Sequence, residues 1–188
     1  VAYGGASNEY LVTWDQIVAQ RSGVYGRRVS AQGVTQGDRV PICATTGNQN
    51  LADLAYDSTR NQFLVVWSDS RSTTTSIDVY GQLVSASGQL VGGNIPVCTD
   101  GSWQYAGAVS YDLQARDFLV VWADGRTEAN RNDIMAQRVN DTGGLAGSQL
   151  AVETTAKNQQ APALAWDSTR DRYLVVWGDW RNYLSTSP

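Results

Sequence analysis

The stretch Phe63-Leu64-Val65-Val66-Trp67-Ser68-Asp69-Ser70-Arg71 decides the fold, because the chain repeats it. Two close copies begin at Phe118 and Tyr173, and a shorter copy begins at Tyr10. The tryptophans of the four copies are spaced by 53, 55 and 55 residues and are Trp14, Trp67, Trp122 and Trp177. A period near 50 residues is typical of propeller blades and similar arrays. We expect a single domain or a fragment of one, with repeats at approximately 1–50, 51–105, 106–160 and 161–188.

Each complete repeat contains four strand candidates and no convincing helical periodicity. In the second repeat these candidates are residues 52–56, 63–67, 78–84 and 95–98. The second candidate is apolar at every position, which predicts a strand that is buried on both faces. The fourth contains Pro96, which an outer edge strand tolerates. The sequence therefore predicts an all-β fold, a β-propeller of four-stranded antiparallel blades with about three and a half blades in this chain.

The last repeat ends after its second strand candidate, and three arrangements are compatible with that count. The chain could be part of a larger propeller, an open array completed by another copy, or a small closed ring with a degenerate last blade. We favour the first, in which the missing strands belong to the remainder of a larger propeller. In the second, the open strand edges would drive association into a homo-oligomer.

Charge and apolar patterning argue against two classes of partner. The formal net charge is -4 and Lys157 is the one lysine, so the chain has no basic cluster for nucleic acid or an anionic membrane. The longest apolar runs are too short to span a bilayer, and no signal segment is visible at Val1. Cys43 and Cys98 occupy the same place in successive repeats. We expect both to be free, buried thiols, because a whole structural unit should separate them.

The repeat also resembles a known kind of protein. The combination Leu-Val-Val-Trp-x-Asp-x-Arg followed by Asp-Val-Tyr-Gly-Gln is similar to the repeats of large extracellular bacterial β-propeller proteins. The resemblance extends over nearly the whole chain. It implies a propeller fold and an extracellular or cell-surface location, and it implies no catalytic residues.

The residue inventory argues against catalysis. The chain has no histidine, so a Ser-His-Asp triad, a Cys-His pair and a histidine metal site are all excluded. Paired carboxylates could still hydrolyse glycosides. However, the most regular aspartates recur from repeat to repeat, whereas an active site needs different residues from different blades. We therefore expect no catalytic residues and no enzyme activity.

An Asp-x-Arg element follows the tryptophan in three of the repeats. Our main interpretation is structural: the carboxylate caps a turn, and the guanidinium of Arg71 or Arg126 pairs with a carboxylate such as Asp78 or Asp133. The alternative is a calcium site, because clustered carboxylate oxygens suit this hard cation. We expect no other cofactor. The metal-site candidates are Asp69, Asp78, Asp124 and Asp133.

Strand parity locates a candidate binding face. In a four-stranded antiparallel blade, the loops after the second and fourth strands emerge on the same side. Variable loops on a rigid scaffold usually carry binding, and aromatic rings beside amides suit sugars or polar peptides. The predicted ligand-binding residues on this face are Trp103, Tyr105, Trp180, Asn48, Gln49 and Asn158.

These observations predict a non-catalytic extracellular module for binding or scaffolding, with carbohydrate as the leading ligand. The alternative is a structural protein that assembles through its incomplete terminal blade. A glycoside hydrolase is the third interpretation.

Overall fold

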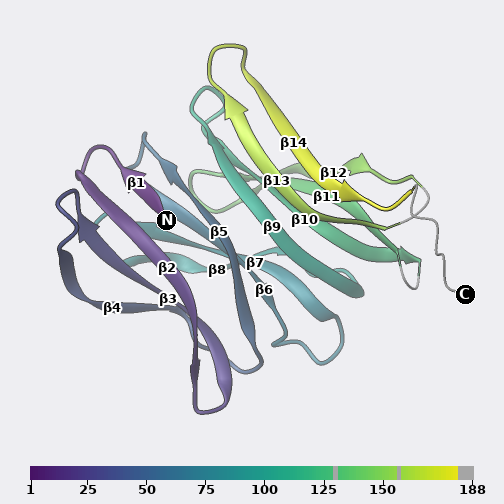
Figure 1. Cartoon of the computed structure of the whole chain (residues 1–188), viewed down its shortest axis with the longest axis horizontal. Helices are drawn as coiled ribbons and strands as arrows, with labels where there is room; N and C mark the ends of the chain where they lie inside the picture. The colour runs from purple at the N-terminus through teal and green to yellow at the C-terminus, as the bar shows by residue number, and fades with distance from the viewer. Residues whose placement is uncertain (129–130, 156–157, 182–188) are drawn as a thin grey trace, which may run out of the picture.

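The computed structural model describes residues 1–128, 131–155 and 158–181, without the side chains of residues 51, 52, 127 and 128. Within these ranges the chain forms 14 strands. The prediction of an all-β fold is confirmed (Figure 1). None of the described residues belongs to a helix with the length and apolar character needed to cross a membrane.

The strands fall into four consecutive units. Unit 1 contains β1 (Ala2–Gly4), β2 (Glu9–Val18), β3 (Arg21–Ser30) and β4 (Thr35–Cys43). Unit 2 contains β5 (Gln49–Asp57), β6 (Gln62–Asp69), β7 (Ser76–Ser85) and β8 (Leu90–Cys98). Unit 3 contains β9 (Ser102–Asp112), β10 (Asp117–Glu128), β11 (Arg131–Asn140) and β12 (Leu145–Glu153). In the described residues, unit 4 consists of β13 (Gln159–Asp167) and β14 (Arg172–Asp179).

Consecutive strands within each unit pair antiparallel, and the units lie side by side (Figure 1). Units 2 and 3 are also joined by a short parallel bridge in which Ser76 pairs with Ser102 and Ile77 with Trp103. The first strands of successive units, β1, β5, β9 and β13, contact one another in that order. We call these four the inner strands.

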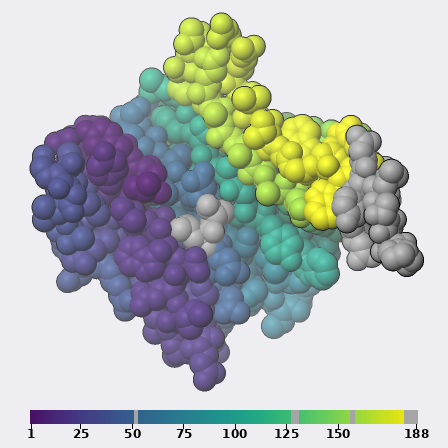
Figure 2. All heavy atoms as spheres, in the orientation of Figure 1, coloured from purple at the N-terminus to yellow at the C-terminus, as the bar shows by residue number. Residues whose placement is uncertain are grey.

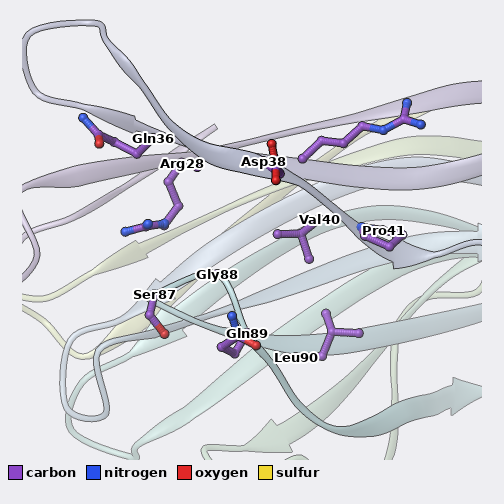
Figure 3. A pocket seen from close by; sticks show the side chains of 11 residues that line it. Arg28, Gln36, Asp38, Val40, Pro41, Ser87, Gly88, Gln89 and Leu90 are labelled. Atoms are coloured by element: carbon purple, nitrogen blue, oxygen red, sulfur yellow. The ribbon is translucent and has the colours of Figure 1, made fainter.

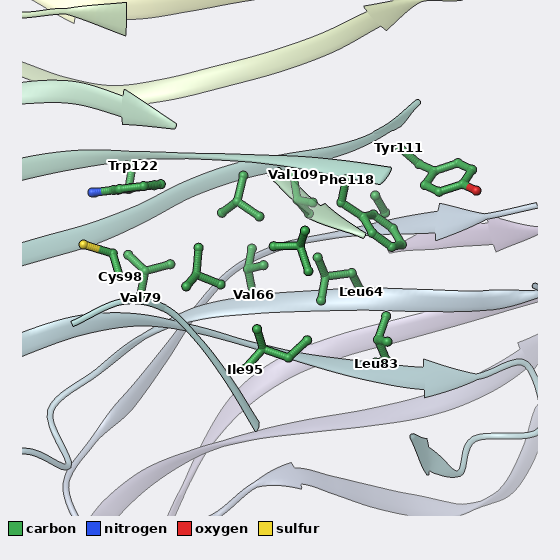
Figure 4. Close-up of a cluster of buried hydrophobic side chains, with 14 residues drawn as sticks. Leu64, Val66, Val79, Leu83, Ile95, Cys98, Val109, Tyr111, Phe118 and Trp122 are labelled. Atoms are coloured by element: carbon green, nitrogen blue, oxygen red, sulfur yellow. The ribbon is translucent and has the colours of Figure 1, made fainter. Parts of the chain in front are cut away.

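The side chains of β6 alternate between two interfaces. Phe63, Val65 and Trp67 pack with residues of unit 1. Leu64 and Val66 pack with unit 3, in the cluster that Figure 4 shows. All eight residues of β6 are buried, which confirms that the continuous apolar run is covered on both faces. Each core of the molecule therefore lies between two units, not within one.

The two ends of the array leave apolar side chains uncovered. Unit 1 forms one end and the β13–β14 pair forms the other (Figure 2). Leu174 and Val176 of β14 are 65% and 52% exposed, whereas the equivalent Leu64 and Val66 of β6 are 0% exposed. The same repeat position is thus core in one unit and surface in another, depending only on whether a further unit covers it.

The difference in burial between Leu64 and Leu174 leads to a prediction about stability, in which Leu174 serves as the control for Leu64. We expect Leu64→Ala to lower the free energy of unfolding by about 2–5 kcal/mol, because it opens a cavity between units 2 and 3. Leu174→Ala should change it by no more than about 0.5 kcal/mol, because that side chain is already solvated. Urea unfolding followed by circular dichroism measures both. Equal losses from the two variants would contradict the stacked arrangement.

The fourth strand of each unit begins earlier than predicted. β8 starts at Leu90 and not at Ile95, and it is irregular near Gly92, whose φ is +69°. The buried Gln82 side chain donates hydrogen bonds to the carbonyls of Val91, at 2.9 Å, and Gly92. Unit 3 repeats this arrangement with Gln137. The irregular segment near Gly92 and the Gln82 side chain that binds it contribute no apolar residues to the pattern. The sequence analysis therefore placed the start of this strand too late.

Both cysteines are free and buried, as predicted. Burial raises the pKa of the Cys98 thiol to about 11 and also raises the pKa of Cys43. Each is therefore a neutral thiol at neutral pH.

Candidate functional site

The loops after the second and fourth strands meet on one side of the array, which we call the loop face. Asn48, in the β4–β5 loop, and Ser70, in the β6–β7 loop, exchange hydrogen bonds: Ser70 N donates to Asn48 O at 2.9 Å, and Asn48 N donates to Ser70 Oγ at 2.8 Å. Trp180 N donates to Asn158 O at 3.1 Å in unit 4. The length of the loop after the second strand varies: β2 and β3 are joined by only Ala19 and Gln20.

Asp69 is held by the residues around it in sequence. It accepts hydrogen bonds from Trp67 Nε1 at 2.7 Å, from Arg71 N at 2.8 Å and from the Arg71 guanidinium. Arg71 in turn reaches unit 1, where its Nη2 lies 3.1 Å from Cys43 Sγ. The Asp-x-Arg element therefore links the core tryptophan of one unit to the outer strand of the preceding unit.

The same linkage recurs at the next two junctions. Asp124 accepts from Trp122 Nε1 at 2.7 Å and from the Arg126 guanidinium. Arg126 Nη2 lies 3.4 Å from Cys98 Sγ, and Arg181 Nη2 donates to Glu153 at 3.2 Å. These contacts support a structural role for the repeated aspartates and arginines. They correct the predicted partners, because Arg71 pairs with Asp69 and Arg126 with Asp124, where Asp78 and Asp133 had been expected.

The second pair of predicted metal ligands lies on the neighbouring strand. Asp78 is 1% exposed and Asp133 is 3% exposed. Asp78 Oδ2 accepts from Thr75 Oγ1 at 2.8 Å, and burial raises the pKa of Asp78. In the part of the chain that is described, no group of three or more His, Cys, Asp or Glu side chains is arranged to hold a metal ion. Calcium binding remains a prediction.

The pKa of the buried Asp124 carboxylate makes the free energy of unfolding depend on pH in the acid range. Burial alone would raise the pKa of Asp124, but hydrogen bonds from Arg126 and Trp122 outweigh it and hold this pKa below its ordinary value of 3.8. A carboxylate with a lowered pKa stabilises the fold fully above its ordinary pKa, and this contribution is lost as the pH falls toward the lowered value. We expect the free energy of unfolding to fall below about pH 5, and to fall less steeply in Asp124→Asn. Urea unfolding at a series of pH values measures this, and parallel pH profiles would count against it.

The predicted ligand-binding residues divide into two groups. The three aromatic residues are substantially exposed: Trp103 by 51%, Tyr105 by 43% and Trp180 by 42%. Gln49 is fully buried, and its Nε2 donates to Thr45 Oγ1 at 3.3 Å. The structure therefore places Gln49 in the scaffold and not at the surface.

The two asparagines tie neighbouring units together. Asn48 Oδ1 accepts from Ser22 N at 3.1 Å, and Asn158 Oδ1 accepts from Asn132 N at 2.9 Å. Both acceptor bonds run from the start of one unit to the third strand of the preceding unit. The predicted set of six is thus not a single site: its amides are structural, and its aromatic rings face solvent.

Sequence reasoning missed Asp53, which lies in the middle of inner strand β5. Asp53 is half-buried, and its Oδ2 accepts from Val109 N of β9 at 3.2 Å. The equivalent residues in β9 and β13 are Ala108 and Ala163, as the strand registers show. The signal in the sequence that could have identified Asp53 is that an aspartate stands where the later repeats have alanine.

Asp53 is unusual among the inner-strand carboxylates. The others described, Asp57, Asp112 and Asp167, end their strands, and each caps the following turn by accepting backbone N–H groups. Asp53 is therefore the one described carboxylate inside an inner strand. A β-bulge immediately precedes it in β5, and β9 and β13 are irregular at the equivalent place, so the bulge belongs to the repeat and the carboxylate alone departs from it.

A groove of about 400 Å³ lies elsewhere, between the outer strands of units 1 and 2 (Figure 3). Arg28 and Asp38 lie on one side of it and Ser87 and Leu90 on the other. Arg28 is paired with Glu9 at 2.9 Å. An equivalent groove between units 2 and 3 has Leu83 in place of Arg28. These grooves follow from the stacking of the units at the outer rim, away from the inner strands.

No family model and no curated protein matches this sequence. Two solved structures are similar in fold. One is an endo-arabinase from Bacteroides thetaiotaomicron VPI-5482, with a TM-score of 0.58 and 13% identity over 94% of this chain and 67% of that one. The other is an N-acetylgalactosamine deacetylase from F. plautii, solved with blood group B trisaccharide, with a TM-score of 0.51 and 11% identity over 88% of this chain and 57% of that one.

These comparisons correct the prediction of a non-catalytic binding or scaffolding module. Both similar structures are carbohydrate-active enzymes, which agrees better with the third interpretation, a glycoside hydrolase. At 11–13% identity the likeness establishes the fold alone. The chain shares its all-β fold of stacked antiparallel sheets with enzymes that act on carbohydrates.

Proposed function

We propose that this chain forms blades of a β-propeller enzyme that hydrolyses glycosidic bonds. The observation that carries the proposal is Asp53, a half-buried carboxylate inside an inner strand that units 3 and 4 do not repeat, since they have Ala108 and Ala163 there. An active site requires such a departure, because a residue present in every blade serves the scaffold. The fold likeness to two carbohydrate-active enzymes supports the choice of substrate class.

The arrangement of the units supports a propeller. Successive inner strands contact one another, as strands around a common axis do. The exposed apolar face of β14, with Leu174 and Val176, matches the face of β6 that the next unit covers. We infer that a further blade covers it in the complete ring. The resemblance to extracellular bacterial propeller repeats supports a secreted enzyme.

Glycoside hydrolysis assigns a definite role to Asp53. The reaction uses two carboxyl groups, one that activates water or attacks the anomeric carbon, and one that protonates the leaving oxygen. Asp53 suits the first role, since its Oδ2 accepts the N–H of Val109 and this hydrogen bond orients the carboxylate. The described inner strands hold no second such residue, so the acid belongs to a loop or to another blade of the ring.

The experiment that tests this function is a hydrolysis screen. The purified protein is incubated with linear arabinan, galactan and xylan, and new reducing ends are measured against time. We expect release from at least one polysaccharide that is proportional to enzyme concentration. Absence of release from all three, by a protein that unfolds cooperatively, would argue against the function.

A further inference from the structure

Trp103 stands where the neighbouring junctions carry a structural asparagine. Asn48 and Asn158 lie 55 residues before and after it. Each of these asparagines uses its side-chain oxygen to accept the backbone N–H of the preceding unit's third strand, from Ser22 and Asn132. A tryptophan has no such acceptor. The junction between units 2 and 3 must therefore be closed in another way.

The backbone makes that closure. Ile77, the equivalent of Ser22 and Asn132, forms a parallel bridge with Trp103 through the main chain. Ser76, beside it, has a φ of +75°, whereas the equivalent Arg21 of unit 1 is not in this region. A non-glycine residue in the left-handed region costs conformational energy, and such residues cluster at functional positions. The altered backbone releases the side chain at position 103 from its structural role, and Trp103 is 51% exposed.

Tyr105 extends the same surface. It lies two residues further along β9, and alternate residues of a strand point to the same side. Tyr105 is 43% exposed, whereas Gln104 between them is fully buried. Two residues along a strand span roughly 6.5 Å, so the two aromatic side chains stand next to each other on the loop face.

The charged groups near this surface are paired with each other. Arg126 binds both Asp100 and Asp124. The Ser102 hydroxyl donates to Gly125 O at 2.8 Å. These paired groups carry one positive and two negative charges, so they disfavour an acidic ligand. Aromatic faces in such a setting favour the apolar faces of uncharged sugar rings over an acidic ligand.

We propose that Trp103 and Tyr105 form a stacking platform for an uncharged polysaccharide, a substrate subsite separate from Asp53. The proposal rests on the function above for its substrate class. Of the six predicted loop-face residues, Asn48 and Asn158 are committed to the junctions and Gln49 is buried, which leaves the three aromatic residues. Trp103 and Tyr105 share strand β9, whereas Trp180 follows β14 in unit 4.

Affinity electrophoresis through gels containing linear arabinan, galactan or xylan tests the platform. We expect at least one polysaccharide to retard the parent protein, and Trp103→Ala and Tyr105→Ala to weaken binding about tenfold each, the loss of one good stacking contact. Trp103→Phe, which keeps an aromatic face, should retain most of the affinity. Tyr3→Ala is the matched control, because Tyr3 is 45% exposed in unit 1, and it should bind like the parent.

Two outcomes would overturn the platform: a parent protein that no polysaccharide retards, or a Trp103→Ala variant that binds like the parent. Selective binding of unglycosylated peptides would count against it too. Failure of the platform is distinguishable from failure of the function. If the protein hydrolyses small aryl glycosides in a way that depends on Asp53 but binds no polysaccharide, only the stacking platform is contradicted. If it binds polysaccharide in a way that depends on Trp103 but hydrolyses nothing, only the proposed catalytic function is contradicted.

Discussion

Replacing Asp124 by alanine is expected to lower the free energy of unfolding by about 3–5 kcal/mol. Asp124 is 1% exposed, and its removal leaves the buried Trp122 Nε1 without its acceptor. Arg126 also loses its principal partner and keeps Asp100 and the Cys98 sulfur at this junction. Burying donors that no longer have acceptors accounts for most of the loss. Urea unfolding at neutral pH, with parallel fluorescence and circular dichroism transitions, measures it.

Asp179→Ala is the matched control for this prediction. Asp179 occupies the equivalent position in unit 4 and binds Arg181 in the same way, but it is exposed to solvent. We expect a far smaller loss, because solvent can replace the missing acceptor. Comparable destabilisation by the two variants would show that burial at the junction is not what makes the linkage strong.

Asp53→Asn is expected to lower kcat for glycoside hydrolysis by about 10²–10⁴-fold, the usual contribution of a positioned acid or base. The amide oxygen of asparagine can still accept the Val109 N–H. The variant should therefore fold like the parent and bind polysaccharide with little change. Steady-state rates on an aryl glycoside, together with the binding gels, separate the loss of chemistry from a loss of substrate affinity.

Asp38→Asn serves as the control for Asp53. Asp38 is exposed and lines the outer groove between units 1 and 2, far along the blade from the inner strands. Its replacement should leave kcat unchanged. If Asp53→Asn retained full activity, or if both variants lost activity equally, Asp53 would not be the catalytic carboxylate.

The repeated apolar stretch was sufficient to predict an all-β fold of antiparallel sheets and the packing of its core. A run such as Phe63 to Trp67 is apolar at successive positions, and only a strand between two sheets can bury both of its faces. The alternation between Leu64, facing unit 3, and Val65, facing unit 1, follows from strand geometry. A structural role for the Asp-x-Arg element was also predicted, but its partners were not: Arg71 pairs with Asp69 and Arg126 with Asp124 of the same element, where Asp78 and Asp133 had been expected.

The site was harder to predict, because a side chain's role depends on what lies opposite it. Asn48 and Gln49 are adjacent polar residues in one loop, yet one binds a backbone amide of unit 1 and the other is buried. Sequence alone offers no means to distinguish either from a ligand-binding amide. Asp53 was missed for a different reason. The repeat pattern is defined by residues that all units share, whereas an active site needs a position at which one unit differs from the others.

The release of reducing ends from polysaccharide, by the parent protein and by Asp53→Asn at equal concentration, decides whether this chain is a glycoside hydrolase that uses Asp53. We expect steady release by the parent and at least a hundredfold slower release by the variant, with both proteins equally stable in urea. Release that is undetectable with the parent, or equal with the two proteins, would contradict it.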